Sequence, residues 1–151
     1  MKIFADNFIK LQTEMINICS EYAMKESEIV FIYCFCNKEM NFSNFFYKIN
    51  GKMKRKHQIK EEIPSSDTKD EIQNDILRRL LRYIEQIEEI CIEYSQPMPL
   101  EMKIIYNKAS DSIETLCEYD FNSVFSDGEV KYAGELEMKW FEELKRENRD
   151  E

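Results

Sequence analysis

Apolar residues near the start of the chain recur at alternating spacings of four and three. These positions are Phe4, Phe8, Leu11, Met15, Ile18 and Tyr22. Such spacing places the side chains on one face of a helix, while charged and amide side chains lie off that face. We therefore expect an amphipathic first helix whose apolar stripe packs into a core.

The pattern changes over Ile29–Cys36, where apolar residues, many of them β-branched or aromatic, follow one another without interruption. Such a run is typical of a strand covered on both faces. A second strand over Asn44–Ile49 leads into Asn50-Gly51, a pair that favours a two-residue hairpin turn. The return strand, Lys52–Ile59, is rich in lysine, which predicts a position at or near an edge of the sheet.

A long helix is predicted over about residues 69–94. Its apolar stripe consists of Ile72, Ile76, Leu80, Ile84, Ile87, Cys91 and Tyr94. Thr68 and Glu71 have the spacing of a capping box, in which each side chain bonds a free backbone N–H of the first turn. The prolines that follow, Pro97 and Pro99, end the helix.

The last third of the chain predicts two strands, over residues 100–106 and 112–119, joined by a polar turn, then a loop over Phe121–Gly128. A final helix over about residues 129–146 carries Tyr132, Leu136, Trp140, Phe141 and Leu144. The order of elements is thus α-β-β-β-α-β-β-α in a single domain, residues 1–151. The hairpins predict an antiparallel sheet of about five strands packed against helices, which is the α+β class.

Composition and charge limit the classes of function that we expect. The chain has 151 residues, 30 acidic and 21 basic, and a net charge of −9. Phosphate backbones repel such a chain, so we do not expect it to bind nucleic acid directly. It has neither a signal-peptide pattern nor an apolar segment long enough to cross a bilayer. With five cysteines, an odd number, the simplest expectation is a cytoplasmic protein with free thiols and no membrane partner.

Catalytic, cofactor and metal sites are not expected. The single histidine, His57, lies in a lysine-rich stretch, and no motif places a nucleophile beside it. Cys34 and Cys36 share one side of a strand, but Cys91 and Cys117 are isolated, so we expect core cysteines rather than a zinc site. The glycines stand apart and form no phosphate-binding loop. We therefore expect a binding protein rather than an enzyme.

Charge is unevenly distributed along the chain. Residues 38–60 are basic and the C-terminal third is acidic. Such a distribution can steer a charged protein partner, although it also serves solubility alone. The residues that we predict to contact a partner are Asp120, Asp127, Glu129 and Glu135.

One segment carries a family resemblance. Asn44–Lys52 (NFFYKINGK), followed by a polar strand, a proline-containing linker and a long acidic helix, resembles the YezG/EsaG-like immunity proteins. Further similarities are the Pro97/Pro99 stretch, Glu118-Tyr119-Asp120, Phe125-Ser126 and Trp140. The resemblance runs over about residues 29–144. It implies a bacterial antitoxin that neutralises a cognate secreted toxin, for instance a nuclease, by occluding its active or substrate-binding surface.

Two alternatives stay open. Secretion chaperones of the type III systems are also small and acidic, have a similar order of helices and strands, and bind unfolded segments of effector proteins as dimers. An enzyme with a closed pocket of converging carboxylates is the other alternative. The sequence leaves open whether the protein is a monomer or a homodimer.

Overall fold

The chain forms helices and strands in the predicted order, with two short helices added. The computed structural model describes residues 2–37, 39–125 and 132–150. Its long helices are α1 (Lys2–Tyr22), α2 (Asp70–Glu93) and α4 (Ala133–Asp150). Its strands are β1 (Ile29–Asn37), β2 (Met40–Ile49), β3 (Lys52–Arg55), β4 (Glu101–Asn107) and β5 (Ser112–Glu118). The short helices are the 3-10 helix η1 (Lys56–Glu61) and α3 (Phe121–Val124).

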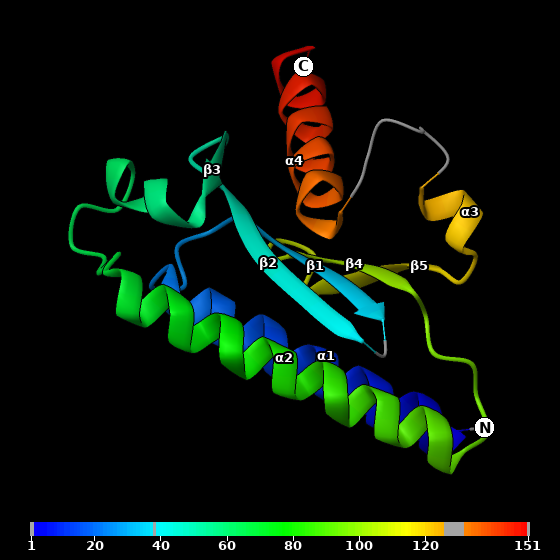
Figure 1. Ribbon diagram of the computed structural model, residues 1–151. Coiled ribbons are helices and arrows are strands. Elements are labelled where there is room, and N and C mark those ends of the chain that lie inside the picture. Colours follow the sequence, from blue (N-terminus) through cyan, green and yellow to red (C-terminus); the bar gives the residue numbers. More distant parts are fainter. Residues whose placement is uncertain (1, 38, 126–131, 151) are drawn as a thin grey trace.

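All five strands join one antiparallel sheet in the order β3-β2-β1-β4-β5, which confirms the predicted α+β class. Figure 1 shows α1 and α2 on one face of this sheet and α4 on the other. β1 is central because its alternate residues supply both cores. Those facing α4 are Phe31, Tyr33 and Phe35, and those facing α1 and α2 are Val30, Ile32, Cys34 and Cys36.

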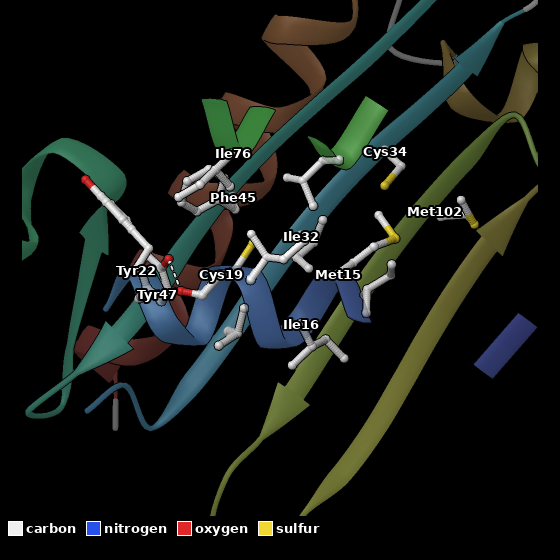
Figure 2. Packing of buried hydrophobic residues seen from close by; sticks show 14 of the residues in the cluster. Met15, Ile16, Cys19, Tyr22, Ile32, Cys34, Phe45, Tyr47, Ile76 and Met102 are labelled. Atoms are coloured by element: carbon white, nitrogen blue, oxygen red, sulfur yellow. Dashed lines mark hydrogen bonds between the residues drawn. The ribbon is translucent and has the colours of Figure 1, made fainter. Parts of the chain in front are cut away.

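The face under α1 and α2 holds the larger core (Figure 2). Leu80, Ile84 and Ile87 of α2 are fully buried there, and burying such a side chain stabilises the fold by about 1.5–3 kcal/mol. Tyr47 is also fully buried, and its hydroxyl donates to the carbonyl oxygen of Cys19 at 2.6 Å. The hydrogen bond offsets the cost of removing this hydroxyl from water.

The face under α4 is aromatic. Trp140 packs edge-on against Phe46, with ring centroids 5.1 Å apart. Arg55 of β3 lies over the ring of Phe141, 4.6 Å from its centroid, and donates to the Glu137 carboxylate at 2.7 Å. The Glu137 side chain is only 1% exposed. This ion pair therefore ties α4 to the edge strand β3.

β2 is longer than predicted at its start, and the turn that follows it is as predicted. β2 starts at Met40 instead of Asn44, because its ladder with β1 continues out to the Asn37–Met40 pair. At the far end, Asn50 and Gly51 have φ angles of 53° and 75°. Two positive φ angles are the requirement of the predicted hairpin turn, and β3 is an edge strand as expected.

The predicted return strand is wrong in its second half. β3 ends at Arg55 and η1 follows. The Gln58 side chain accepts the Arg55 backbone N–H at 2.9 Å, and Lys54 pairs with Glu61 at 2.6 Å. These local contacts favour the 3-10 turn over a continued strand. His57, expected as an exposed strand residue, is exposed but lies in η1.

The predicted capping box of Thr68 and Glu71 is also wrong. α2 begins at Asp70, and its N-cap residue Lys69 makes no side-chain capping bond. The Asp67 side chain accepts the Lys69 N–H at 3.2 Å. Asp67 thus holds the turn that precedes the helix and moves the helix start past Thr68.

The segment after β5 differs from the prediction as well. The expected loop begins with α3, because the Asp120 carboxylate accepts the Asn122 N–H at 3.2 Å and caps a helical turn. α4 begins at Ala133, so Tyr132 lies before the helix and is exposed instead of contributing to its apolar stripe.

No helix in the described ranges combines the length and the apolarity that a bilayer span requires.

Candidate protein-binding site

One hollow in the surface is lined mainly by apolar side chains from segments far apart in the sequence. It has a volume of about 370 Å³ and we call it the aromatic hollow. Its lining residues are Phe35, Asn37, Met40, Phe121, Phe125, Tyr132 and Ala133. They come from the end of β1, the start of β2, α3 with its C-cap, the first residue of α4 and the residue before it. Large exposed apolar side chains gathered around a hollow are typical of a binding surface.

A series of ring contacts holds Phe121 at the surface. The Phe121 and Phe125 ring centroids lie 4.6 Å apart, and Phe125 in turn packs edge-on against Phe35 at 5.7 Å. Phe35 is buried in the core under α4. Phe121 itself is 59% exposed. The exposed ring is therefore supported through two aromatic contacts by the rigid sheet, which limits the entropy that it loses on binding.

The opposite side of the hollow carries Met40, which is 63% exposed, and the exposed Tyr132. Tyr132 packs directly over Gly134, where an added Cβ atom would lie 3.2 Å from the Tyr132 Cε2 atom. A side chain at position 134 would press on this ring. Methionine and aromatic residues are the types enriched at the centres of protein interfaces.

Of the four acidic residues predicted to contact a partner, the structure places two beside the aromatic hollow. Asp120 directly precedes the lining residue Phe121, and its carboxylate also accepts the Ser123 hydroxyl at 3.3 Å. Glu135 lies in the first turn of α4, and its backbone N–H bonds the Tyr132 carbonyl at 3.1 Å. The other two predicted residues, Asp127 and Glu129, lie outside the described residues. Residues 120–135 contain four acidic side chains and one lysine, so this stretch is acidic.

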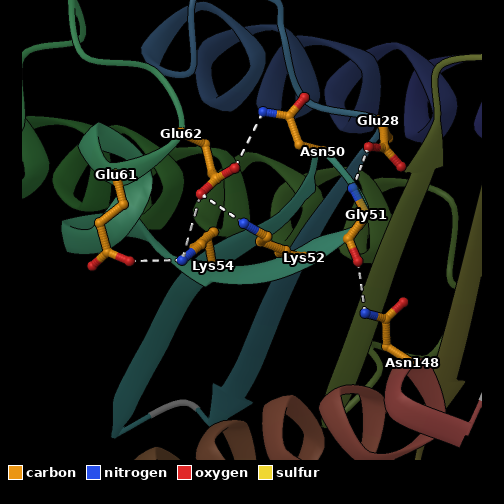
Figure 3. A network of polar contacts seen from close by, with 8 residues as sticks. All are labelled: Glu28, Asn50, Gly51, Lys52, Lys54, Glu61, Glu62 and Asn148. Carbon is orange, nitrogen blue, oxygen red and sulfur yellow. Dashed lines mark hydrogen bonds and ion pairs between the residues drawn. The ribbon is translucent and has the colours of Figure 1, made fainter.

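The basic hairpin, formed by β2 and β3, has fewer unpaired positive charges to offer a partner than the sequence indicates. Figure 3 shows Lys52 and Lys54 directed at the carboxylate of Glu62, with N–O distances of 3.5 and 3.9 Å. Lys54 also pairs with Glu61, and Arg55 with Glu137 of the acidic C-terminal third. Three basic side chains of this segment are therefore paired with carboxylates, and these ion pairs offset part of its positive charge.

Four of the five cysteines are buried, as predicted, and all five are free. Burial raises the pKa of Cys34 to about 12 and raises that of Cys36 further. Burial also raises the pKa of Cys19 well above the ordinary value. These thiols stay protonated at neutral pH, where the thiolate is the reactive form. Among residues 2–37, 39–125 and 132–150, no three histidine, cysteine or acidic side chains form a group that could hold a metal ion.

A larger hollow, of about 610 Å³, lies between α1 and the β4–β5 hairpin. Several of its polar side chains bond to groups nearby. Tyr106 donates its hydroxyl to Asp111 at 2.8 Å, which raises the pKa of Tyr106, and Lys108 donates to the Lys25 carbonyl at 2.6 Å. These bonds fasten the hairpin and its neighbouring loop, which is a structural role.

Sequence reasoning named Asp120 and Glu135, which lie next to lining residues of the aromatic hollow, but not the apolar lining itself. Phe121 fell in a predicted loop and Tyr132 in a predicted helix stripe, so neither was recognised as an exposed contact residue. The available signal was Asp120 followed by Asn122 and Ser123, which indicates a capped helical turn. Such a turn would have fixed the direction of Phe121.

Comparison with protein-family models found no match, and neither did a search of curated proteins.

Proposed function

We propose that the protein is a cytoplasmic immunity protein that binds a cognate bacterial toxin and neutralises it by covering the toxin's active or substrate-binding surface. The observation that carries the binding role is the aromatic hollow, where the exposed Phe121 is backed by Phe125 and Phe35. The assignment of a toxin as the partner comes from the resemblance to the YezG/EsaG-like immunity proteins.

The composition of the hollow supports a protein partner over a small polar ligand. A protein interface has an apolar core of aromatic and methionine side chains surrounded by a polar rim. Phe121, Met40 and Tyr132 supply such a core, and each is more than half exposed in the free protein. A partner that covers them removes apolar surface from water, which favours association.

The acidic residues Asp120 and Glu135 indicate which partners fit the hollow. Asp120 and Glu135 flank the lining, so a partner with basic residues around an apolar projection is complementary. The nucleic-acid site of a nuclease is basic. A nuclease toxin is therefore a suitable partner, because occupying that site also blocks the toxin's substrate.

The test is rescue of a host cell that expresses a candidate toxin domain taken from a gene adjacent to the gene for this protein. The wild-type protein should restore growth, and Phe121→Ser should weaken toxin binding roughly 30-fold or more, as expected for an exposed aromatic anchor. Ile92→Ser is the matched control, because Ile92 is 71% exposed on α2 and does not line the aromatic hollow. Binding is measured by calorimetry on purified proteins.

Equal affinity of Phe121→Ser and wild type would rule out the hollow as the binding surface. Failure of the wild-type protein to rescue growth would reject the immunity role itself. A dimer that binds only an unfolded segment of its partner would instead support a secretion chaperone.

A further inference from the structure

The two edges of the sheet differ in how they are protected. β3 is short and carries Lys52, Lys54 and Arg55, and η1 follows it directly. β5 pairs with β4 over its whole length without a bulge. Between residues 112 and 118 it contains no proline, lysine or arginine. Proline, bulges and charged side chains, especially lysine, are the usual devices that keep a sheet edge from pairing with another strand. Of these, β5 carries only its two glutamates, Glu114 and Glu118.

The ladder shows which backbone groups of β5 face outward. Cys36 donates its N–H to the Leu100 carbonyl, and Lys108 donates its N–H to the Glu28 carbonyl. The even-numbered residues of β4 thus bond β1, and its odd-numbered residues bond β5. The partners of those odd-numbered residues are Ser112, Glu114, Leu116 and Glu118. The intervening residues of β5, namely Ile113, Thr115 and Cys117, direct their N–H and C=O groups away from the sheet.

The side chains of β5 give this edge two different faces. Thr115 donates to Gln12 of α1 at 3.0 Å, so the odd-numbered side chains lie on the α1 face. The opposite face carries Glu114 and Glu118, with Leu116, 47% exposed, between them. Within the described part of the chain neither glutamate has an ion-pair partner.

The nearest basic side chain across the ladder does not balance these glutamates. Lys103 is the partner of Leu116 on β4. Its ammonium lies over the Trp140 ring, 5.5 Å from the centroid, and 3.9 Å from the Glu101 carboxylate. Lys103 is therefore turned toward α4 and Glu101, and the edge of β5 keeps its negative charge.

From this geometry we infer that β5 accepts an added antiparallel strand from another protein, and that this strand alternates basic with apolar residues. Its basic side chains lie beside Glu114 and Glu118, and its apolar side chains lie beside Ile113 and Cys117. A second copy of this chain is disfavoured, because it would bring the same glutamates together on two molecules that each carry a charge of −9. None of the β5 residues lines the aromatic hollow, so this inference does not depend on the proposed function.

The probe is a fluorescein-labelled ten-residue peptide of alternating valine and lysine, titrated into the protein at low salt. Valine residues lie opposite Ile113, Thr115 and Cys117, so their N–H groups face β5. N-methylation of the valine amides should weaken binding roughly tenfold or more, whereas N-methylation of the lysine amides should change it less than about threefold. Both methylated peptides keep the same charge and side chains.

Two double charge variants test whether the face of β5 that carries Glu114 and Glu118 contributes to peptide binding. Glu114→Lys with Glu118→Lys should weaken peptide binding roughly tenfold, and Glu85→Lys with Glu89→Lys, an equal charge change on exposed residues of α2, should weaken it far less. Hydrogen exchange on the wild-type protein provides a measurement that needs no variant. The amides of Ile113, Thr115 and Cys117 should exchange more slowly when the peptide is bound.

Equal binding of the two methylated peptides would overturn the proposed strand addition, and so would equal losses in the two charge variants. Protection of the three amides that rises with protein concentration, without any peptide, would show that a second copy occupies the edge. None of these results bears on the growth-rescue experiment that tests the aromatic hollow, so either proposal can be rejected without the other.

Discussion

Glu137 is the most deeply buried charged side chain among the described residues, and its carboxylate pairs with Arg55. We predict that Glu137→Gln lowers the free energy of unfolding by about 2–3 kcal/mol, because Arg55 then keeps its charge in a partly buried site without a carboxylate. Urea unfolding measures the effect. Glu147→Gln, an exposed change on the same helix, is the control. A loss below about 0.5 kcal/mol would mean that the ring contacts of Arg55 suffice to hold it.

At the scale of elements, the turn between β2 and β3 depends on Glu62 of the segment that follows η1. Its carboxylate accepts from the Asn50 side chain at 3.2 Å and faces Lys52 and Lys54 (Figure 3). The hydrogen bond from Asn50, together with the two lysines, lowers the pKa of Glu62 below its ordinary value. A lowered folded-state pKa stabilises the fold above the unfolded pKa, and this stability is lost as the pH falls through the folded pKa.

We therefore predict that Glu62→Gln destabilises the protein more at about pH 7 than at an acidic pH below the lowered pKa of Glu62, where the wild-type carboxylate is protonated too. Urea unfolding at the two pH values measures the difference, with the exposed Glu89→Gln as control. An effect of equal size at both pH values would show that the shape of the side chain matters and its charge does not.

The same elements show how far sequence reasoning reaches. The run Ile29–Cys36 correctly predicts a strand covered on both faces, because burial on both faces requires apolar residues at every position. Asn50-Gly51 predicts its turn because the required φ angles are local. The end of β3 at Arg55 was missed, since it depends on bonds that Arg55 and Lys54 donate to Gln58 and Glu61, which a strand pattern does not reveal.

The aromatic hollow was missed for a related reason. Phe35 and Phe121 are far apart in the sequence and meet through Phe125 only after the sheet and α3 have formed. Apolar periodicity identifies side chains that suit a core but does not tell which of them stay exposed. Tyr132 shows this directly, because it has the spacing of a helix stripe and yet precedes α4.

At the scale of the whole molecule, the ion pairs that form on folding change how much positive charge remains unpaired. Lys52, Lys54 and Arg55 pair with Glu62, Glu61 and Glu137, so part of the positive charge that the sequence indicates is offset within the folded protein, whose net charge is −9. An acidic surface near an apolar hollow contributes to a complex in two ways. Charge speeds the encounter of the proteins, and apolar contact slows their separation.

This division predicts a kinetic result for the proposed toxin complex. Asp120→Asn keeps the cap of α3, since asparagine caps as well as aspartate, and it can be combined with Asp127→Asn, Glu129→Gln and Glu135→Gln. The combined variant should associate roughly tenfold more slowly at low salt, with a nearly unchanged dissociation rate. The difference should vanish at about 0.5 M salt, where screening removes long-range attraction.

The control variant neutralises Glu71, Glu85, Glu89 and Glu93, which are exposed on α2, and changes the net charge by the same amount. If both variants slow association to the same extent in surface-plasmon measurements, only total charge matters. If neither does, the acidic stretch has no part in the encounter and the hollow alone would have to account for recognition.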